Sequence, residues 1–600
     1  MEKIARLYQK YRNYIEDGLF LVFLAFYPLT KINQGLDITD TCYSLGNAQY
    51  FPTAKGTWMT ATYLANAVGW LLMQLPQGDT LRGMYFYTGL LVSGMALISY
   101  FALRKKIPAW IVFIGELAAV SLCWAPTTVL YQYLTYFLMG AGMLLLYGGI
   151  CTERTRGRIR FCCLFGAGIC LGANVAVRMP NVVQAAFILV LWYAAYRRKE
   201  AFTDTCRETL VCMAGYLTGF GIPLLCICLQ YGFTAYPDMV RTMFAMTDKA
   251  VDYKPSAMIT GMFTDYITGL YWLAFAGACA GILYVLYRVK EAVFPQKHNW
   301  LYGLACVGIC LVLVRFYWGR GMFNFAYNEY RSIYQWAVLF LLVAIASAVW
   351  LFCNKRSRIE DNALALLILL AIFLTPLGSN NILYPIINNL FLVAPFTLWI
   401  CYSWFVKTRG ILRHWPWKSM LVMIIGMLLA QGIGFHTQFA FSDGIWGEKR
   451  DTLLSVMPKT AGIYTNRENA ELFEELGAFA EERQFAGKEV ILYGKIPGLS
   501  YLLDMPTAIS SAWPDLDSYR LMEMKQDMEA VELKMDVSRP VVIVASGIAA
   551  YKGEDAKAYE WFGVDVEAYD ADEKLGILLQ FLDDYGYEET FCNMRYAVYE

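Results

Sequence analysis

Two acidic residues stand close together in the polar segment that follows the first apolar stretch of the chain. Asp37 and Asp40 lie in residues 35–58, which read GLDITDTCYSLGNAQYFPTAKGTW. A carboxylate can act as a general base, taking a proton from a hydroxyl or amine as that group attacks a sugar carbon. Low-dielectric surroundings at a membrane surface would help to tune its pKa. Asp40 could instead cap a helix that runs from Thr41, and Asp37 could share or compete for the role of base.

These acids belong to a chain that is mostly apolar. Of its 600 residues, 58% are hydrophobic and 17% are charged, against about 25% charged residues in soluble proteins. Runs of about 20 apolar residues, which predict transmembrane helices, recur between residues 18 and 437. Lys plus Arg equals Asp plus Glu, at 50 each, so the net charge indicates no nucleic-acid partner. The predicted fold class is therefore mainly α, a polytopic membrane protein.

The basic residues indicate how many times the chain crosses the membrane, because Lys and Arg gather in cytoplasmic loops. The clusters after the basic N-terminus fall near residues 104–106, 154–160, 197–199, 288–297, 355–358 and 407–413. These clusters all lie on one side of the membrane only if the apolar segment 58–75 does not cross it, but lies as an interfacial helix in the first outer loop. We therefore predict about 13 transmembrane helices in a plasma membrane, with a cytoplasmic N-terminus and an external C-terminus.

The composition becomes polar from residue 438. Strand-like runs at 490–493 and 540–545 are interspersed with helix-like runs at 466–483, 518–534 and 573–584, a pattern that predicts a small α/β domain. Neither strand is followed by a glycine fingerprint for a dinucleotide. We expect a transmembrane domain over 1–437 and a soluble extracytoplasmic α/β domain over 438–600, the second with a structural or substrate-covering role.

Several arginines are predicted at or near the outer membrane surface, where a charge is costly unless it has a partner or a function. They are Arg178 at an outer turn, Arg315 at the outer end of a span, and Arg320 and Arg331 in the next loop. Such residues would suit an anionic ligand, or they could pair with Glu329, Asp238 or lipid headgroups.

The outer loops also contain candidate substrate contacts. Asp238 belongs to the long loop 231–265, whose other charged residues could equally bind an acceptor. Aromatic residues between 318 and 330, Tyr327 among them, could stack on a sugar or form part of the interfacial belt. None of the three histidines clusters with cysteine, so the sequence indicates no zinc site of the usual ligand types.

A span, an outer loop with an acid near its start, interfacial helices, many further spans and an outer α/β tail together resemble the GT-C superfamily of membrane glycosyltransferases. The pattern is similar to that of protein O-mannosyltransferases and bacterial aminoarabinose transferases. Asp40 with Tyr43 matches the family's acid followed three or four residues later by an aromatic residue. Thr41 stands where a second acid is common, which weakens a metal site built from such a pair and leaves the participation of a divalent cation open.

The resemblance implies an inverting transferase that moves a sugar from a polyprenyl-phosphate carrier to a cell-surface glycan, lipid or protein. It gives Asp40 the role of base. In the aminoarabinose-transferase pattern, a lysine just before the interfacial helix meets the carrier phosphate, and Lys55 occupies the matching place. Lys55 could also be an interfacial lysine that reaches toward the headgroups. The arginines Arg178, Arg315, Arg320 and Arg331 would be further partners of the phosphate.

Three other functions stay open. A transporter or flippase of lipid-linked sugars would carry charges deep in several spans and two related halves, whereas Glu116 stands nearly alone at mid-depth. A polymerase or ligase of polysaccharide would place its main site in a later loop such as 231–265. A non-catalytic membrane scaffold would use the tail for binding.

Overall fold

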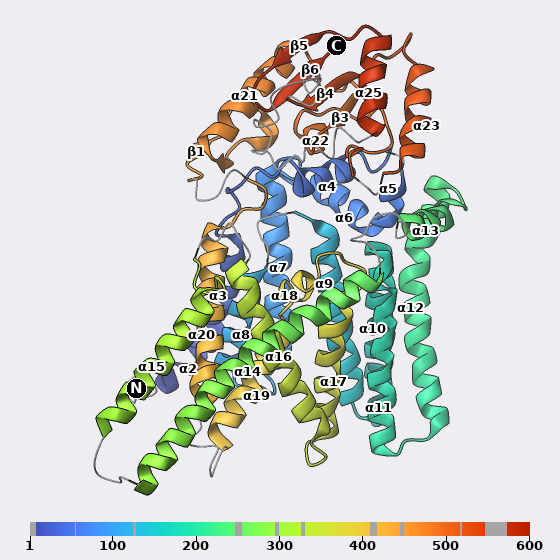
Figure 1. The fold of residues 1–600 in the computed structure, drawn as a ribbon. Helices are drawn as coiled ribbons and strands as arrows, with labels where there is room; N and C mark the ends of the chain where they lie inside the picture. The colour runs from blue at the N-terminus through green and yellow to red at the C-terminus, as the bar shows by residue number, and fades with distance from the viewer. Residues whose placement is uncertain are drawn as a thin grey trace.

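The chain folds into a helical bundle with an α/β domain stacked on one end (Figure 1). The computed structural model describes residues 8–54, 56–123, 128–246, 255–293, 299–325, 331–407, 417–443, 449–516, 519–546 and 573–600. Within these ranges, nine helices are long and apolar enough to cross a membrane. The prediction of a mainly α, multi-pass membrane protein is confirmed.

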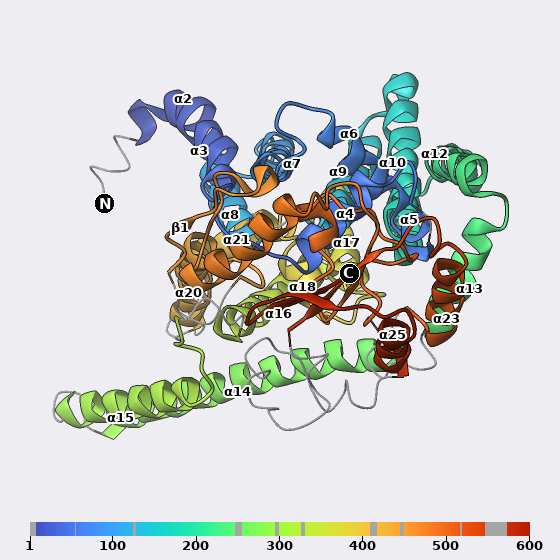
Figure 2. The same cartoon turned by 90° about the horizontal axis from the view of Figure 1, so that it is seen from above.

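A helix occupies each stretch that the sequence predicts to cross. The long ones are α7 (Leu81–Leu103), α9 (Leu130–Cys151), α10 (Gly157–Val177), the 3-10 helix η4 (Met179–Phe187) continued by α11 (Ile188–Arg198), α12 (Phe202–Tyr231), α14 (Pro255–Val293), α15 (Asn299–Trp318), α16 (Arg331–Cys353) and α20 (Trp417–Gln438). The shorter ones are α3 (Phe20–Phe26), α8 (Ala109–Leu122), α17 (Ile359–Leu374) and α19 (Val393–Lys407). Seen from above, α14 and α15 extend away from the other helices (Figure 2).

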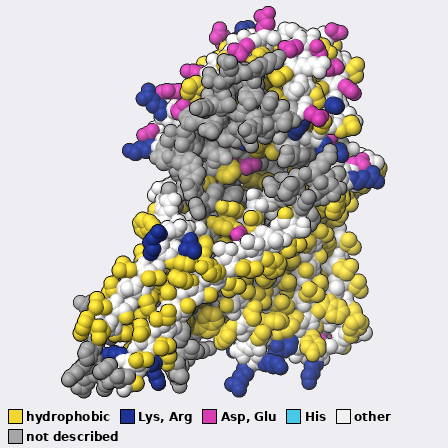
Figure 3. All heavy atoms as spheres, viewed as in Figure 1, with side chains coloured by type: hydrophobic (Ala, Val, Ile, Leu, Met, Phe, Trp, Pro, Cys, Tyr) yellow, Lys and Arg dark blue, Asp and Glu magenta, His cyan; other side chains and the backbone are white. Residues whose placement is uncertain are grey.

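Ion pairs link the basic loops at the end of the bundle opposite the α/β domain. These pairs are Arg104–Asp17 at 2.5 Å, Arg160–Glu208 at 2.7 Å, Arg198–Glu360 at 2.6 Å and Lys106–Asp361. Figure 3 shows Lys and Arg side chains along this lower edge, apolar side chains over the bundle, and many acidic side chains on the upper domain. The gathering of basic loops at one end agrees with the counting of crossings, and the cytoplasmic position of that end stays a prediction.

The first outer loop forms short helices between the bundle and the α/β domain (Figure 1). They are α4 (Asp40–Gln49), α5 (Thr57–Ala61) and α6 (Tyr63–Met73). Eleven residues of helix in α6 rise about 16 Å, roughly half of the apolar thickness of a bilayer. α6 lies between the bundle and the upper domain (Figure 1), and its position at a membrane surface stays a prediction. The loop places the two acids at the junction of the two layers.

The upper domain contains a four-stranded mixed sheet in the order β3-β4-β6-β5. Its strands are β3 (Val490–Tyr493), β4 (Val541–Ala545), β5 (Glu589–Cys592) and β6 (Tyr596–Tyr599). The accompanying helices are α21 (Arg467–Glu482), α22 (Leu499–Leu502), α23 (Leu521–Glu532) and α25 (Glu573–Asp584), and β1 (Thr452–Leu453) pairs with β2 (Tyr464–Thr465) beside them. β3 and β4 are parallel and fully buried, as their unbroken apolar sequence predicts. The antiparallel pair β5–β6 was not predicted.

The upper domain and the first outer loop share one hydrophobic core. Leu36 and Ile38 are buried in the same cluster as Leu502 and Val598. The backbone N–H of Gly498 donates to the carbonyl of Ile38 at 2.8 Å. Because packing continues across the two segments, the domain fixes the position of α4. The boundary that the sequence places at 437/438 falls at the end of α20 and stays a prediction.

Candidate active site

Asp37 is turned into the protein, against the start of α4. Asp37 as a whole is 1% exposed. Oδ1 accepts hydrogen bonds from the N–H of Thr39 at 2.8 Å and from its hydroxyl at 2.5 Å, and Oδ2 accepts from the N–H of Thr41 at 2.8 Å. Burial raises the pKa of Asp37, and these hydrogen bonds oppose the shift. The carboxylate of Asp37 thus accepts hydrogen bonds from N–H groups at the beginning of the helix, which have no partner within the helix itself.

Asp40 is the first residue of α4 and faces the other way, into a cavity. Its carboxylate accepts no hydrogen bond from the described parts of the chain, which differs from the capping role that the sequence allowed. Burial, and then repulsion by Asp37, raises the pKa of Asp40 to about 7. A general base is most effective when its pKa is near the working pH, so Asp40 has the properties of such a base.

The cavity beside Asp40 has a volume of about 610 Å³ and lies between the bundle and the upper domain. Tyr43 lines it one helical turn after Asp40, and Arg178 lines it from the bundle. Trp513 of the upper domain contributes to its lining and meets Tyr43 edge to face, with ring centroids 5.5 Å apart. The structure therefore brings Asp40, Tyr43 and Arg178 to one cavity from distant parts of the chain.

Arg178 carries a positive charge into this cavity. α10 ends at Val177, and Arg178 has an extended backbone (φ −160°, ψ 120°) that turns the chain into η4. Its guanidinium donates to the carbonyl of Gly378, in the loop that follows α17. Within the described residues Arg178 forms no ion pair with an acid. A guanidinium with spare donors suits a phosphate or carboxylate group of a ligand.

A buried polar network holds the chain in place next to Arg178. The side-chain amide of Asn181 donates to the hydroxyl of Thr135 at 2.9 Å, and that of Asn174 donates to Gln184 at 2.8 Å. All four side chains are buried, so their hydrogen bonds are costly to break. The network ties α9 and α10 to η4 and limits how far Arg178 can move.

The cavity has walls of two kinds. Val182, Val183, Met258 and Ile259 line it with apolar side chains from η4 and α14. Polar side chains and backbone of the loop 378–381 line it near Arg178. A lining of apolar surface with few convergent polar groups is typical of a small-molecule site. It suits a ligand that has both a charged head and an apolar tail.

The structure places other predicted site residues away from this cavity. Arg315 is exposed near the end of α15. Arg320 stacks on the ring of Phe316, 3.5 Å from its centroid, and Asp238 pairs with Arg241 at 3.1 Å on the exposed face of α13 (Ala235–Met246). Lys55 and Tyr327 lie outside the described residues, and of Arg331 only the backbone, at the start of α16, is described.

Several residues that line the cavity were not predicted from the sequence. Asn47 and Asn66 come from the first outer loop, and Gly378 comes from the GSNN turn, which was predicted only as a connection. Trp513 comes from the upper domain. A tryptophan in a polar segment, as in SAWPDL, was the available signal, but nothing local told which surface it would meet.

This cavity contains few carboxylates, and its other side-chain oxygens belong mainly to amide and hydroxyl groups. Among the described lining residues, Asp40 is the only carboxylate. Both oxygens of Asp37 are taken by hydrogen bonds from Thr39 and Thr41, and no group of three or more His, Cys, Asp or Glu in the described chain could hold a metal ion. A divalent cation bound here would need amide or hydroxyl oxygens besides the carboxylate of Asp40, and its participation stays a prediction.

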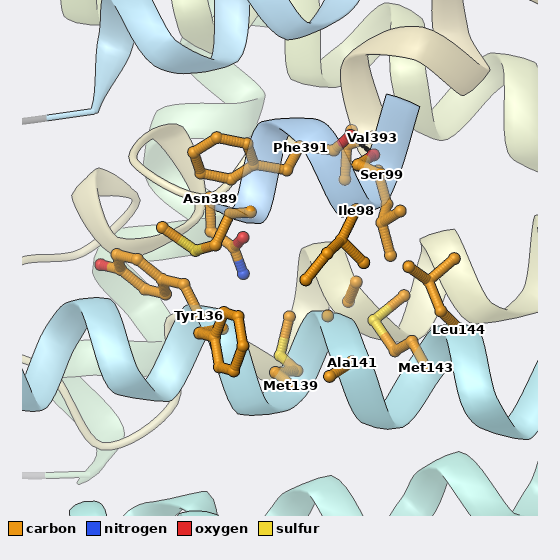
Figure 4. A pocket seen from close by; sticks show the side chains of 15 residues that line it. Ile98, Ser99, Tyr136, Met139, Ala141, Met143, Leu144, Asn389, Phe391 and Val393 are labelled. Carbon is orange, nitrogen blue, oxygen red and sulfur yellow. Dashed lines mark hydrogen bonds between the residues drawn. The ribbon is translucent and has the colours of Figure 1, made fainter. Parts of the chain in front are cut away.

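A second hollow, of about 30 Å³, lies inside the bundle (Figure 4). Tyr136 lines both cavities. In the wall of this hollow, Ser99 donates a hydrogen bond to the carbonyl of Phe391 at 2.7 Å. Glu116, the acid that the sequence places at mid-depth, is fully buried in α8. A water needs roughly 10–15 Å³ of such space, so this hollow accommodates about two waters and no sugar or lipid.

No family model and no curated protein matches the sequence. Among solved structures, the chain is similar to the Archaeoglobus fulgidus oligosaccharyltransferase in complex with Zn and sulfate, at 12% identity over 88% of this chain and 68% of that one, with a TM-score of 0.46. It is also similar to ArnT from Cupriavidus metallidurans bound to undecaprenyl phosphate, at 10% identity over 98% and 97% of the two chains, with a TM-score of 0.42. Both of these neighbours have the GT-C fold.

Proposed function

We propose that the chain is a membrane glycosyltransferase that moves a sugar from a polyprenyl-phosphate carrier to a cell-surface acceptor. The observation that supports this proposal is that Asp40, Tyr43 and Arg178 line one cavity, which is bounded by apolar walls on the bundle side. The resemblance of the first outer loop to the GT-C pattern points to the same chemistry.

In the proposed reaction, a hydroxyl or amine of the acceptor attacks the anomeric carbon of the sugar. Asp40 takes the proton from the attacking atom as the new bond forms. The bond between that carbon and the phosphate oxygen breaks, and polyprenyl phosphate leaves with the electron pair. A single displacement of this kind inverts the configuration of the sugar.

Arg178 would bind the phosphate of the donor. Its guanidinium stabilises the charge that grows on the leaving phosphate, and charge-assisted hydrogen bonds of this kind are stronger than neutral ones. The apolar side chains Val182, Val183, Met258 and Ile259 would contact the first isoprene units. Tyr43 would contact the sugar, and Trp513 would cover the site from the upper domain.

The pKa of Asp40 fits this role. A base with a pKa of about 7 is largely ionised just above neutrality and still binds a proton well. Asp37 would hold the first turn of α4 and its charge would raise the proton affinity of Asp40. In this proposal the two acids that the sequence could not separate have different roles, one as base and one as helix anchor.

Reconstitution in liposomes tests the proposal. The purified chain is supplied with a polyprenyl-phosphate donor bearing a labelled sugar and with a cell-envelope extract as acceptor. We expect labelled product together with free polyprenyl phosphate in equal amounts. Movement of the donor between leaflets without product would identify a transporter and overturn the proposal. Extension of a growing polysaccharide that survives the loss of Asp40 would place the site in another loop.

A further inference from the structure

A second polar cavity lies beside the proposed active site, between α5 and the upper domain. Its volume is about 220 Å³, and Trp58 lines both this cavity and the larger one. The remaining described lining is mainly polar and comes from the start of α5, from α23 and from the loop that precedes α23. We propose that this cavity, called here the side cavity, binds a carbohydrate acceptor, an inference that rests on the proposed function.

The side cavity contains a carboxylate that is held in a fixed position. Oδ2 of Asp527 accepts hydrogen bonds from the N–H of Ser510 at 2.9 Å, from its hydroxyl at 2.5 Å and from the hydroxyl of Tyr519 at 2.5 Å. In the described parts of the chain, Oδ1 of the same carboxylate accepts no hydrogen bond. A fixed carboxylate with one free oxygen is a good acceptor for a sugar hydroxyl, because its orientation costs no entropy on binding.

A second group of the lining is available to a ligand. Gln526 immediately precedes the fixed acid Asp527 in α23, lines the side cavity and is exposed. Its amide can both donate and accept a hydrogen bond. Glu523, one turn earlier, is occupied: it accepts from the N–H and the guanidinium of Arg520, each at 3.0 Å. A cation would need several free carboxylates here, whereas a polyhydroxylated ring needs mixed donors and acceptors.

Trp58 supplies the aromatic surface that sugar rings commonly use. Its side chain is half-buried at the boundary of the two cavities. Ser511 lines the side cavity and lies close to the hydroxyl of Tyr43, which lines the larger one. A sugar bound in the side cavity would therefore lie next to the larger cavity, where Asp40 is the proposed base.

The geometry disfavours a peptide as the occupant. A peptide usually binds along a free strand edge or in apolar pockets. In β3, the N–H of Val490 donates to the carbonyl of Pro506 and its carbonyl accepts from the N–H of Ala508, both at 2.9 Å. That edge of β3 is therefore covered at this point, and the side cavity offers side-chain polar groups instead.

The contact between the two layers at this place is unusually close. A Cβ added to Gly56 would lie 2.5 Å from the carbonyl oxygen of Ser510, and Gly56 has φ +130°. Both features require glycine. The first outer loop and the upper domain thus meet at the side cavity, and a ligand bound there would contact both of them.

Glycan binding by the full-length chain in detergent tests the inference without any turnover. The probe is an array of immobilised cell-envelope oligosaccharides that also presents peptides. We expect saturable binding to at least one oligosaccharide class, weakened about fivefold by Gln526→Ala, the effect of one hydrogen bond. The matched control is Lys525→Ala, which changes an exposed neighbour on α23 that does not line the side cavity.

Three outcomes would overturn the inference: no bound oligosaccharide, binding to peptides alone, or oligosaccharide binding that Gln526→Ala leaves unchanged. The proposed function is judged separately, by release of polyprenyl phosphate from the labelled donor. A chain that turns over donor but binds no glycan would disprove only the side cavity. A chain that binds glycans at Gln526 but never releases polyprenyl phosphate would disprove the transferase.

Discussion

The N–H of Thr41 donates to Oδ2 of Asp37 at 2.8 Å, and this bond separates the roles of two acids that lie three residues apart. It fixes Asp37 beneath the first turn of α4, while Asp40 faces the cavity. The same helix packs against the upper domain through Cys42 and Leu45. One short helix thus links the carboxylate, its supporting acid and the domain that covers the site.

Replacing Asp37 should lower stability before it affects chemistry. Asp37→Ala removes all three hydrogen bonds at the start of α4, and we expect a loss of about 1–2 kcal/mol in the free energy of unfolding, the cost of a lost helix cap. Asp37→Asn keeps one side-chain oxygen and should cost less. Thermal unfolding followed by tryptophan fluorescence measures both. Equal stability of Asp37→Ala and the wild type would contradict the anchoring role.

Replacing Asp40 should slow the transfer reaction without lowering stability. Asp40→Asn keeps the shape of the side chain but removes the base, so we expect the transfer rate to fall about 10²- to 10⁴-fold while the melting temperature does not fall. The control is Asp238→Asn, which alters an exposed acid paired with Arg241 and should leave transfer unchanged. Full activity of Asp40→Asn would remove Asp40 from the reaction.

The pH dependence of transfer should follow the pKa of Asp40, about 7. Asp40 acts as a base only when ionised, so the rate should rise with pH up to about 7 and then level off, falling about tenfold per unit well below the pKa. A rate profile between about pH 5 and 9 tests this. The residual rate of Asp40→Asn should lack the inflection.

The same pKa also predicts a change in stability with pH. Because folding raises the pKa of Asp40 above its ordinary value, the folded state favours the protonated carboxyl. The stability that the folded state gains from the protonated carboxyl of Asp40 is complete at acid pH and is lost as the pH rises through about 7. The stability gained by Asp40→Asn relative to the wild type should therefore increase with pH over that range. A constant difference would contradict the shift.

The sequence predicted the elements of this fold better than their contacts. Unbroken apolar runs identified β3 and β4, and the basic loops set α6 apart from the crossing helices, which agrees with its place between the bundle and the upper domain (Figure 1). Both signals are local: they depend on the periodicity or the charge of a single segment. The pair β5–β6 was not predicted, because both strands are only four residues long and β5 has an irregular exposure pattern, with a register shift between Glu589 and Phe591.

The site was predictable only in part, because its residues come from segments far apart in the chain. Motif and charge singled out Asp40, Tyr43 and Arg178, which the structure places at one cavity. Arg320 has the same kind of charge, yet it stacks on Phe316 elsewhere. The role of Trp513 depends on how the upper domain docks, which no local pattern contains.

Arg178 should determine affinity for the anionic part of the donor. Arg178→Ala is expected to weaken binding of polyprenyl phosphate about 10- to 100-fold, the effect of a lost charge-assisted hydrogen bond. Arg178→Lys should restore part of the affinity, since it keeps the charge but not the planar donor pair. Arg320→Ala, away from the cavity, is the control and should bind normally. Equal losses of affinity in Arg178→Ala and Arg320→Ala would show that binding of polyprenyl phosphate depends only on the total charge of the protein.

Docking of the upper domain should depend on Gly498. A Cβ at this position would lie 2.4 Å from the Cβ of Cys42 and from the carbonyl oxygen of Ile38, and overpacking of this kind costs about 1–3 kcal/mol. Gly498→Ala should therefore lower the melting temperature, shift α4 with Asp40, and expose the junction to limited proteolysis. Gly576→Ala is a matched control, because Gly576 in α25 has open space at this position. If both variants melt alike and resist protease alike, the contact of Gly498 with α4 does not hold the two layers together.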